Sequence, residues 1–154
     1  MKKILFVCTG NICRSPTAHA IARHKIKMLK LENKFIVDSA GIEGFHAGEA
    51  PDERAVMVGK KHDISFNGIF SRQIKISDFD EFDYLMAMDR SHFEKLRKIS
   101  PKHEEKIKLF LPFCDSAHIM NGEVLDPYYY DNKTFEKVFT VVELAIKNLI
   151  KKYA

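Results

Sequence analysis

A cysteine and an arginine separated by five residues stand directly after an apolar run near the start of the chain. Residues 4–7 read as a buried strand, and a helical pattern begins at Pro16; between them lies the octet Cys8-Thr9-Gly10-Asn11-Ile12-Cys13-Arg14-Ser15. A loop that leads from a strand into a helix N-terminus directs backbone N–H groups at one point, which suits an anion. These donors and Arg14 should favour the thiolate form of Cys8. A thiolate in a phosphate-shaped cradle predicts nucleophilic phosphoryl transfer through a phosphocysteine intermediate.

Several residues of the octet have the types that such a cradle requires. Gly10 allows the tight turn that aims amides inward, and Asn11 tolerates left-handed backbone and can hold the loop through its side chain. Arg14 offers a planar fork for two phosphoryl oxygens, which a lysine lacks. The residues expected to surround the phosphoryl group are Thr9, Gly10, Asn11, Ile12 and Cys13.

Ser15 has two readings from the sequence. It is a good N-cap for the helix that follows, with Pro16 suited to the first turn. Its hydroxyl can instead donate to the sulfur of Cys8 and stabilise the thiolate when it leaves the intermediate. Both readings keep Ser15 among the residues that carry the chemistry, together with Cys8 and Arg14.

The alternative for Cys8 is a purely structural role. An isolated cysteine at the end of a strand is usually a small buried hydrophobic residue. The spacing to Arg14 and Ser15 favours the functional interpretation, because the local context matches the motif. A Walker-type nucleotide loop is excluded, since no Gly-Lys-Ser/Thr follows.

Asp126 is the candidate general acid. Departure of a phenolate is slow unless a carboxylic acid protonates it, an effect worth about 10²–10⁴ in rate. Asp126 would then act as a base toward water in the second step. Pro127 restricts the backbone beside it, and Tyr128 and Tyr129 are expected to form an aromatic wall for a phenyl ring. The alternative is that Asp-Pro only begins a turn.

The octet resembles the signature of the low-molecular-weight protein tyrosine phosphatases. Three more segments resemble that family in the same order, and the resemblance covers nearly all 154 residues: 37–41 (Val-Asp-Ser-Ala-Gly), 82–89 (Phe-Asp-Tyr-Leu-Met-Ala-Met-Asp) and 126–129 (Asp-Pro-Tyr-Tyr). The resemblance implies hydrolysis of protein phosphotyrosine and of small aryl phosphates. It implies phosphotyrosine-containing proteins as partners, and inorganic phosphate or a similar oxyanion as product and inhibitor.

The resemblance also assigns supporting roles. It implies that Ser39 hydrogen-bonds Asn11, and that Phe45 lies on the rim of the site with His46 beside it. The alternative for Phe45 is an aromatic ring packed on its own loop. In the family the second thiol, here Cys13, can form a disulfide with the nucleophile; a structural loop thiol is an equal alternative.

Three positions depart from the family pattern. Tyr130 stands where many relatives have glycine, which should alter the shape of the acid loop. Ile69 stands where some members have a histidine that supports Asn11, so this contact should be missing. His19 replaces a common glutamate, with little expected effect.

Three rival functions remain to be weighed. Arsenate reductases share the cysteine–arginine loop, but they need two more redox cysteines after the third strand; residues 72–100 have none and Cys114 is single. A protein-arginine phosphatase would have threonine in place of Ile12. A non-enzymatic phosphate-binding module would need neither Cys8 nor Asp126.

The composition bounds the remaining classes. The chain has 154 residues, 45% hydrophobic and 30% charged, with a net charge of +4, which fits a single globular domain and an anionic substrate. We expect no nucleic-acid or membrane partner, because there is no basic run and no long apolar segment. Three cysteines without framework spacing indicate a reducing, cytoplasmic location. We expect a monomer with no cofactor and no metal, since no metal-ligand spacing occurs.

Alternating strand and helix patterns predict a four-stranded parallel sheet flanked by helices, as in Rossmann-like folds. Expected strands are residues 4–7, 35–37 (ending at 39–41), 84–88 and 106–111. Expected helices are residues 15–31, 51–61, 91–99 and 133–151, with a short turn at 78–82. Ser91 is the expected N-cap of the third of these helices. The nucleophile loop should lie at the carboxyl end of a central strand, the usual ligand crevice.

Overall fold

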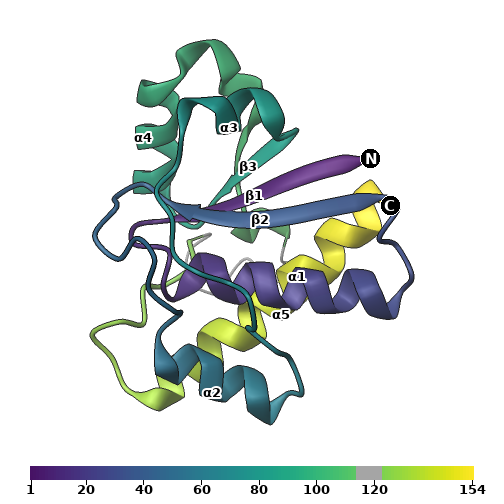
Figure 1. Cartoon of the computed structure of the whole chain (residues 1–154), viewed down its shortest axis with the longest axis vertical. Coiled ribbons are helices and arrows are strands. Elements are labelled where there is room, and N and C mark those ends of the chain that lie inside the picture. The colour runs from purple at the N-terminus through teal and green to yellow at the C-terminus, as the bar shows by residue number, and fades with distance from the viewer. Residues whose placement is uncertain (114–122) are drawn as a thin grey trace.

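The computed structural model describes residues 1–113 and 123–154, and a parallel four-stranded sheet lies at its centre (Figure 1). The strands are β1 (Lys2–Cys8), β2 (Phe35–Gly41), β3 (Tyr84–Ala87) and β4 (Ile107–Leu109), in the order β2-β1-β3-β4. The predicted α/β class, the parallel sheet and its four strands are confirmed. The chain forms one domain, as expected.

Residues 4–7 form a continuous apolar run because β1 is covered on both faces. Ile4 and Phe6 pack into the larger core, on the side of α1 and α5, whereas Leu5 and Val7 pack into the smaller core on the other side. All four side chains are fully buried. β1 pairs with β2 along its whole length and with β3 over its second half, so Cys8 emerges between two neighbours.

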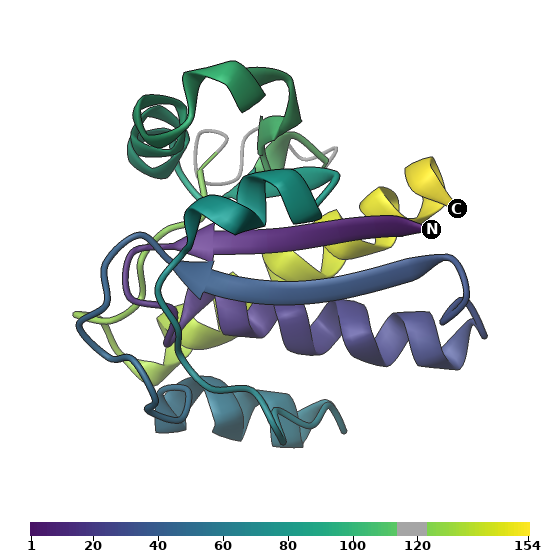
Figure 2. The same cartoon turned by 45° about the horizontal axis from the view of Figure 1, so that its top comes forward.

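Helices cover the two faces of the sheet unequally (Figures 1 and 2). One face carries α1 (Arg14–Met28) and α5 (Asn132–Tyr153), with α2 (Glu53–Lys61) packed on α5. The other carries α3 (Ile76–Glu81) and α4 (Arg90–Ile99), with the short 3₁₀ helix η1 (Pro101–Lys106) beside them. A second 3₁₀ helix, η2 (Leu111–Phe113), follows β4 and packs against α5. None of the helices in the described ranges is long and apolar enough to span a bilayer.

The strand order places a topological switch point between β1 and β3. The connection through α1 leads outward to β2, and the chain then crosses to β3 on the opposite side of β1. At such a switch point the loops at the carboxyl ends of two adjacent strands diverge and leave room for a ligand. The loop after Cys8 and the turn after Met88 both lie there.

The structure corrects two predicted helix caps. Cys13, not Ser15, is the N-cap of α1, so Ser15 lies inside the first turn with its hydroxyl directed elsewhere. Asp89, not Ser91, caps α4, where its carboxylate accepts a hydrogen bond from the backbone N–H of His92. An aspartate is as good a cap as a serine, so residue type alone did not distinguish the two positions.

Element boundaries differ by a few residues from those predicted. α1 ends at Met28 rather than residue 31, α2 begins at Glu53 after its cap Asp52, and β4 is confined to Ile107–Leu109. The short helix α3 starts two residues earlier than expected. These shifts leave the predicted topology intact.

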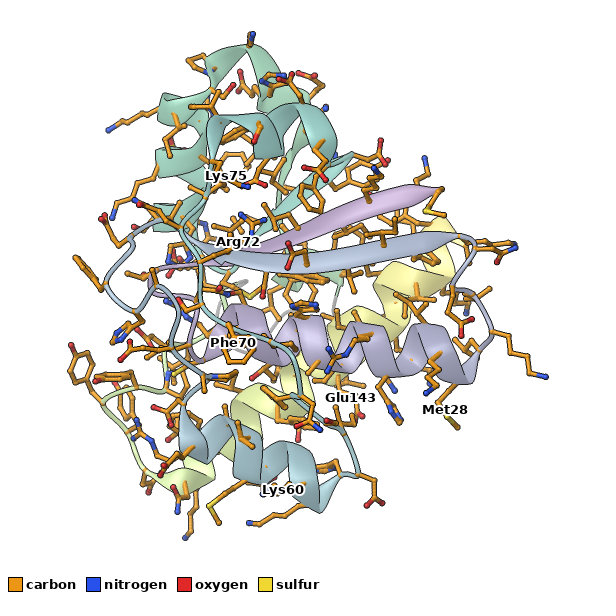
Figure 3. The ribbon with its side chains drawn as sticks, in the orientation of Figure 1. Met28, Lys60, Phe70, Arg72, Lys75 and Glu143 are labelled. Atoms are coloured by element: carbon orange, nitrogen blue, oxygen red, sulfur yellow. The ribbon has the colours of Figure 1, made fainter. Side chains whose placement is uncertain are left out.

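The sequence pattern leaves the stretch from residue 65 to 75 unassigned. In the structure it makes a turn at residues 67–68, and residues 72–74 then run beside the carboxyl end of β2. Gly41 and Gln73 form an isolated parallel bridge, and Arg72 ion-pairs with Asp38 and Asp78. Figure 3 shows Arg72 beside β2, with Lys75 leading into α3. This segment therefore braces the edge of the nucleophile loop.

Candidate active site

Cys8 lies at the end of β1, with its sulfur at the first turn of α1. The Sγ atom is 3.0 Å from Oγ of Ser15. That oxygen also accepts a hydrogen bond from Nδ2 of Asn11 at 2.7 Å. Because Asn11 donates, the Ser15 hydroxyl keeps its own hydrogen for the sulfur. Of the two readings of Ser15, the geometry therefore favours the hydroxyl that faces Cys8.

Asn11 holds the loop from behind. Its backbone has φ of 57°, the left-handed conformation that asparagine tolerates. Its side-chain oxygen accepts a hydrogen bond from the backbone N–H of Arg72 at 3.0 Å. Ser71 adds a hydrogen bond from its hydroxyl to the Gly10 carbonyl at 2.8 Å. Asn11 is buried, so it supports the cradle from outside the pocket.

The supporting contact predicted for Ser39 is different in the structure, whereas the contact predicted to be missing at Ile69 is replaced by one from another residue. The Ser39 hydroxyl pairs with Nδ1 of His19 at 2.9 Å rather than with Asn11, so that prediction is wrong in its partner. Ile69 is a buried core residue, and the backbone of Arg72 holds Asn11 in place of a histidine side chain. His19 thus has a structural role that the sequence did not indicate.

Arg14 is almost fully buried beneath the pocket, with 4% of its side chain exposed. Its Nη1 donates to Oδ2 of Asp89 at 2.8 Å and to the carbonyl of Val124 at 3.0 Å. Its Nη2 lies 3.6 Å from Oδ2 of Asp126. The guanidinium therefore joins the turn after β3 to the segment that carries Asp126, and its orientation is fixed before any anion binds.

Asp89 and His92 belong to the site although the sequence did not mark them. His92 is buried, and its Nε2 is 2.8 Å from Oγ1 of Thr9, while its Nδ1 is 3.2 Å from Oδ1 of Asp89. Burial, with Arg14 nearby, lowers the pKa of His92 to about 4, so the ring is neutral at pH 7. The signal for Asp89 was its place directly after a buried strand at the ligand crevice.

Asp126 stands at the mouth of the site, with 44% of its side chain exposed. Its Oδ1 accepts a hydrogen bond from the backbone N–H of Tyr128 at 3.1 Å. The segment before it is anchored, because the N–H of Val124 donates to the carbonyl of Met88 at 2.7 Å. Asp126 is thus held beside Arg14 and still open to solvent.

The converging residues enclose a pocket of about 230 Å³. Its walls come from the nucleophile loop, the loop after β2 and the segment after residue 125. The residues that line it are Cys8, Thr9, Gly10, Ile12, Cys13, Arg14, Phe45, His46, Asp126, Tyr128 and Tyr129. Phe45 and Tyr129 are strongly exposed, and the Tyr128 and Tyr129 rings meet edge to face at 4.9 Å. The pocket therefore has a charged floor and an aromatic rim.

Cys13 is a buried free thiol, as is Cys8. Burial, then the charge of Asp52 and the neighbouring Cys8, raise the pKa of Cys13 well above its ordinary value, so it stays protonated at pH 7. A protective disulfide between the two remains a prediction. Cys114 lies outside the described residues.

Within residues 1–113 and 123–154, no three histidine, cysteine, aspartate or glutamate side chains gather as a metal site would require. What the pocket offers instead is a sulfur, a buried guanidinium and a carboxyl group. These three can attack, hold and protonate an anionic ester.

Comparison with known proteins agrees with this geometry. The family model for low molecular weight phosphotyrosine protein phosphatase matches residues 3–154. The Saccharomyces cerevisiae protein of that name is 38% identical over 151 residues, which cover 97% of this chain and 93% of the relative. A crystal structure of a protein tyrosine phosphatase from Entamoeba histolytica superposes with a TM-score of 0.92 at 40% identity, covering 99% of this chain and 96% of that one. The structure of YfkJ from Bacillus subtilis also gives 0.92, at 38% identity, covering 99% and 94%.

Proposed function

Because this chain belongs to the low molecular weight phosphotyrosine protein phosphatase family, a family of hydrolases, we propose that it hydrolyses protein phosphotyrosine through a phosphocysteine on Cys8. One observation carries the proposal. The sulfur of Cys8, the buried guanidinium of Arg14 and the carboxyl of Asp126 line one pocket, with the Ser15 hydroxyl 3.0 Å from that sulfur. A module that only bound phosphate would need neither the sulfur nor the carboxyl group.

In the first step the Cys8 thiolate attacks phosphorus and the bond to the phenolic oxygen breaks. Asp126, protonated, gives its hydrogen to that oxygen, so tyrosine leaves as a neutral phenol. Arg14 and the backbone amides of residues 9–14 hold the three equatorial oxygens. The Nη1 edge of Arg14 is bound to Asp89, so the phosphoryl oxygens face Nη2 and Nε.

In the second step water attacks the phosphorus of the phosphocysteine. The Asp126 carboxylate takes a proton from this water, the sulfur–phosphorus bond breaks, and Cys8 leaves as a thiolate. The Ser15 hydroxyl donates to the departing sulfur, which lowers the energy of the developing negative charge. Inorganic phosphate then dissociates, and as a product that fits the same cradle it inhibits competitively.

The pocket walls favour an aryl ester. Ile12 presents an apolar side chain, and Phe45, Tyr128 and Tyr129 form a rim that can stack a phenyl ring. Phosphoarginine would place a charged guanidinium against these groups, which costs desolvation. We therefore infer a preference for phosphotyrosine-containing proteins. The mechanism needs Cys8 as a free thiol, so we place the reaction in a reducing compartment such as the cytoplasm.

The test compares turnover of para-nitrophenyl phosphate, a phosphotyrosyl peptide and a phosphoarginyl peptide by the wild type, Cys8→Ser and Asp126→Asn. We expect no turnover by Cys8→Ser and a loss of about 10²-fold or more by Asp126→Asn on the phosphotyrosyl peptide. Phosphate binding without turnover in the wild type would contradict the enzyme assignment. Faster turnover of phosphoarginine would keep the chemistry and overturn the argument from Ile12.

A further inference from the structure

The start of α2 is tied to the nucleophile loop by its capping residue. The backbone N–H of Asp52 donates to the carbonyl of Ile12 at 2.8 Å. The Asp52 carboxylate then accepts from the backbone N–H of Arg54 at 2.9 Å, which is the N-cap contact of the helix. Asp52 is therefore fixed relative to residues 8–15 by its main chain and relative to α2 by its side chain.

Asp52 in turn fixes the plane of the Arg54 guanidinium. Nε of Arg54 donates to Oδ1 at 3.0 Å and Nη2 donates to Oδ2 at 2.9 Å, so both oxygens of Asp52 are held by one rigid fork. Burial alone would raise the pKa of Asp52, but the hydrogen bonds from Arg54 outweigh it and lower the pKa below its ordinary value. Both partners are therefore charged at pH 7.

The third edge of the same guanidinium reaches the segment that follows Asp126. Nη1 of Arg54 donates to the main-chain carbonyl of Tyr130 at 3.2 Å. Its Cζ lies 5.6 Å from the ring centroid of Tyr128 and 4.4 Å from that of Phe135, at the start of α5. Arg54 thus contacts this segment at Tyr128 and Tyr130, and α5 at Phe135.

That segment carries the general acid on a short turn. The N–H of Tyr128 donates to Oδ1 of Asp126, and the N–H of Tyr130 donates to the carbonyl of Pro127. A shift of Tyr128 or Tyr130 would therefore move the carboxyl group of Asp126. Arg54 binds the main-chain carbonyl of Tyr130, so this contact does not depend on the tyrosine side chain.

We propose that Arg54 is a positioning residue for the general acid: with Asp52 it joins the nucleophile loop to the turn that carries Asp126 and so sets where that carboxyl group stands over the bound phosphate ester. This inference rests on the proposed function. This role requires a guanidinium, which binds Asp52 through two nitrogens and Tyr130 through the third. A lysine at this position would keep the charge but could not hold Asp52 and Tyr130 together. The effect on catalysis passes entirely through Asp126.

The test measures kcat/KM for a series of aryl phosphates whose phenols differ in acidity, because this ratio covers all steps up to departure of the phenol. Phenyl phosphate, whose phenol resembles tyrosine with a pKa of about 10, needs the proton most. We expect Arg54→Met to lower kcat/KM for phenyl phosphate by about 10- to 100-fold, and to lower it much less for para-nitrophenyl phosphate, which leaves readily as an anion. Arg54→Lys should also lower kcat/KM more for phenyl phosphate than for para-nitrophenyl phosphate, but by less than Arg54→Met does.

The same Arg54 substitution made in the Asp126→Asn variant shows whether its effect on kcat/KM passes through Asp126. In Asp126→Asn the further change Arg54→Met should cost nothing on phenyl phosphate, because no acid remains to be placed. The inhibition constant of inorganic phosphate should stay unchanged in both Arg54 variants, since the cradle is intact. Urea unfolding reports whether each variant is folded under the assay conditions.

Arg97→Met is the matched control. Arg97 also pairs with carboxylates, Glu94 and Glu104, and lies 5.7 Å from a ring centroid, that of Phe93, but it sits at the far end of α4. It should change stability without changing the leaving-group dependence. The proposal would be overturned if Arg54→Met lowered kcat/KM equally for all aryl phosphates. It would also be overturned if Arg54→Met lowered kcat/KM as much in Asp126→Asn as it does in the wild type. Failure of the wild type to hydrolyse any aryl phosphate would instead overturn the proposed function.

Discussion

At the scale of single residues, the site depends on the direction of a few hydrogen bonds. Asn11 donates to Ser15, and this leaves the serine hydrogen for Cys8. Asp89 fixes one edge of Arg14, and this leaves the other edge for the substrate. The Ser15 hydroxyl and the Arg14 guanidinium are therefore each oriented by a hydrogen-bond partner, and we expect little reorganisation when an anion enters.

Ser15→Ala tests the hydroxyl that faces the sulfur. Loss of a hydrogen bond to a charged group costs about 1.5–3 kcal/mol, or roughly 10- to 100-fold in rate. Departure of the Cys8 thiolate in the second step should slow most, so para-nitrophenolate should appear in a rapid burst before a slow steady state in stopped-flow traces. Ser100→Ala, a buried serine outside the site, is the control and should show wild-type traces. A uniform loss without a burst would contradict the role.

At the scale of elements, the strand ends determine where the loops run. The carboxyl end of β2 lies directly against the nucleophile loop, and a side chain on Gly41 would place Cβ 2.8 Å from the carbonyl oxygen of Thr9. Gly59 in α2 is equally crowded, with Cβ 2.6 Å from Cε1 of Phe66 and 2.7 Å from the carbonyl oxygen of Ile64. The two glycines are therefore packed about equally tightly, but only Gly41 lies against the nucleophile loop.

Gly41→Ala and Gly59→Ala form a matched pair. Both should destabilise the protein by about 1–3 kcal/mol, because backbone or ring atoms must move. Only Gly41→Ala should also lower kcat/KM at a temperature where both variants are fully folded, since only it displaces residues 9 and 10. Urea denaturation and para-nitrophenyl phosphate assays on the two variants check this, and equal activity of both would be inconsistent with the account.

Sequence patterns predicted the elements better than the contacts between them. The apolar run at residues 4–7 and the periodic apolar face of α5 indicate a buried strand and an amphipathic helix, because those signals are local. The partner of Ser39 could not be read in this way, since it depends on which residue of α1 faces β2. Asp89 and His92 were missed for the same reason: their contacts with Arg14 and Thr9 span 75 and 83 residues.

At the scale of the whole molecule, the buried His92 and the partly buried His19 make stability depend on pH. His19 pairs with Ser39 between α1 and β2, and His92 pairs with Thr9 between α4 and the nucleophile loop. Burial lowers the pKa of each to about 4, although Asp38 and Asp89 oppose the shift. Both rings are therefore neutral in the folded protein, while in the unfolded chain they titrate near 6.5.

Stability should fall as the pH drops from about 6.5 to 4. In this window the unfolded chain binds protons that the folded protein does not, so the free energy of unfolding increases with pH. The contribution of the two histidines reaches its full value above about pH 6.5. Each histidine contributes at most about 1.4 kcal/mol per pH unit. Urea unfolding at several pH values should show a smaller slope for His19→Gln and for His92→Asn, and a still smaller one for the double variant. Unchanged slopes would refute the buried neutral state.

The most direct test of the central claim, a phosphocysteine on Cys8, is the partition of the phosphoryl group between water and an added alcohol such as ethylene glycol. We expect the ratio of alkyl phosphate to inorganic phosphate to be the same for phenyl phosphate, para-nitrophenyl phosphate and a phosphotyrosyl peptide. All three would pass through one phosphocysteine that no longer carries the leaving group, and Cys8→Ser should form neither product. A ratio that varies with the leaving group would contradict a shared covalent intermediate, as would the formation of both products by Cys8→Ser.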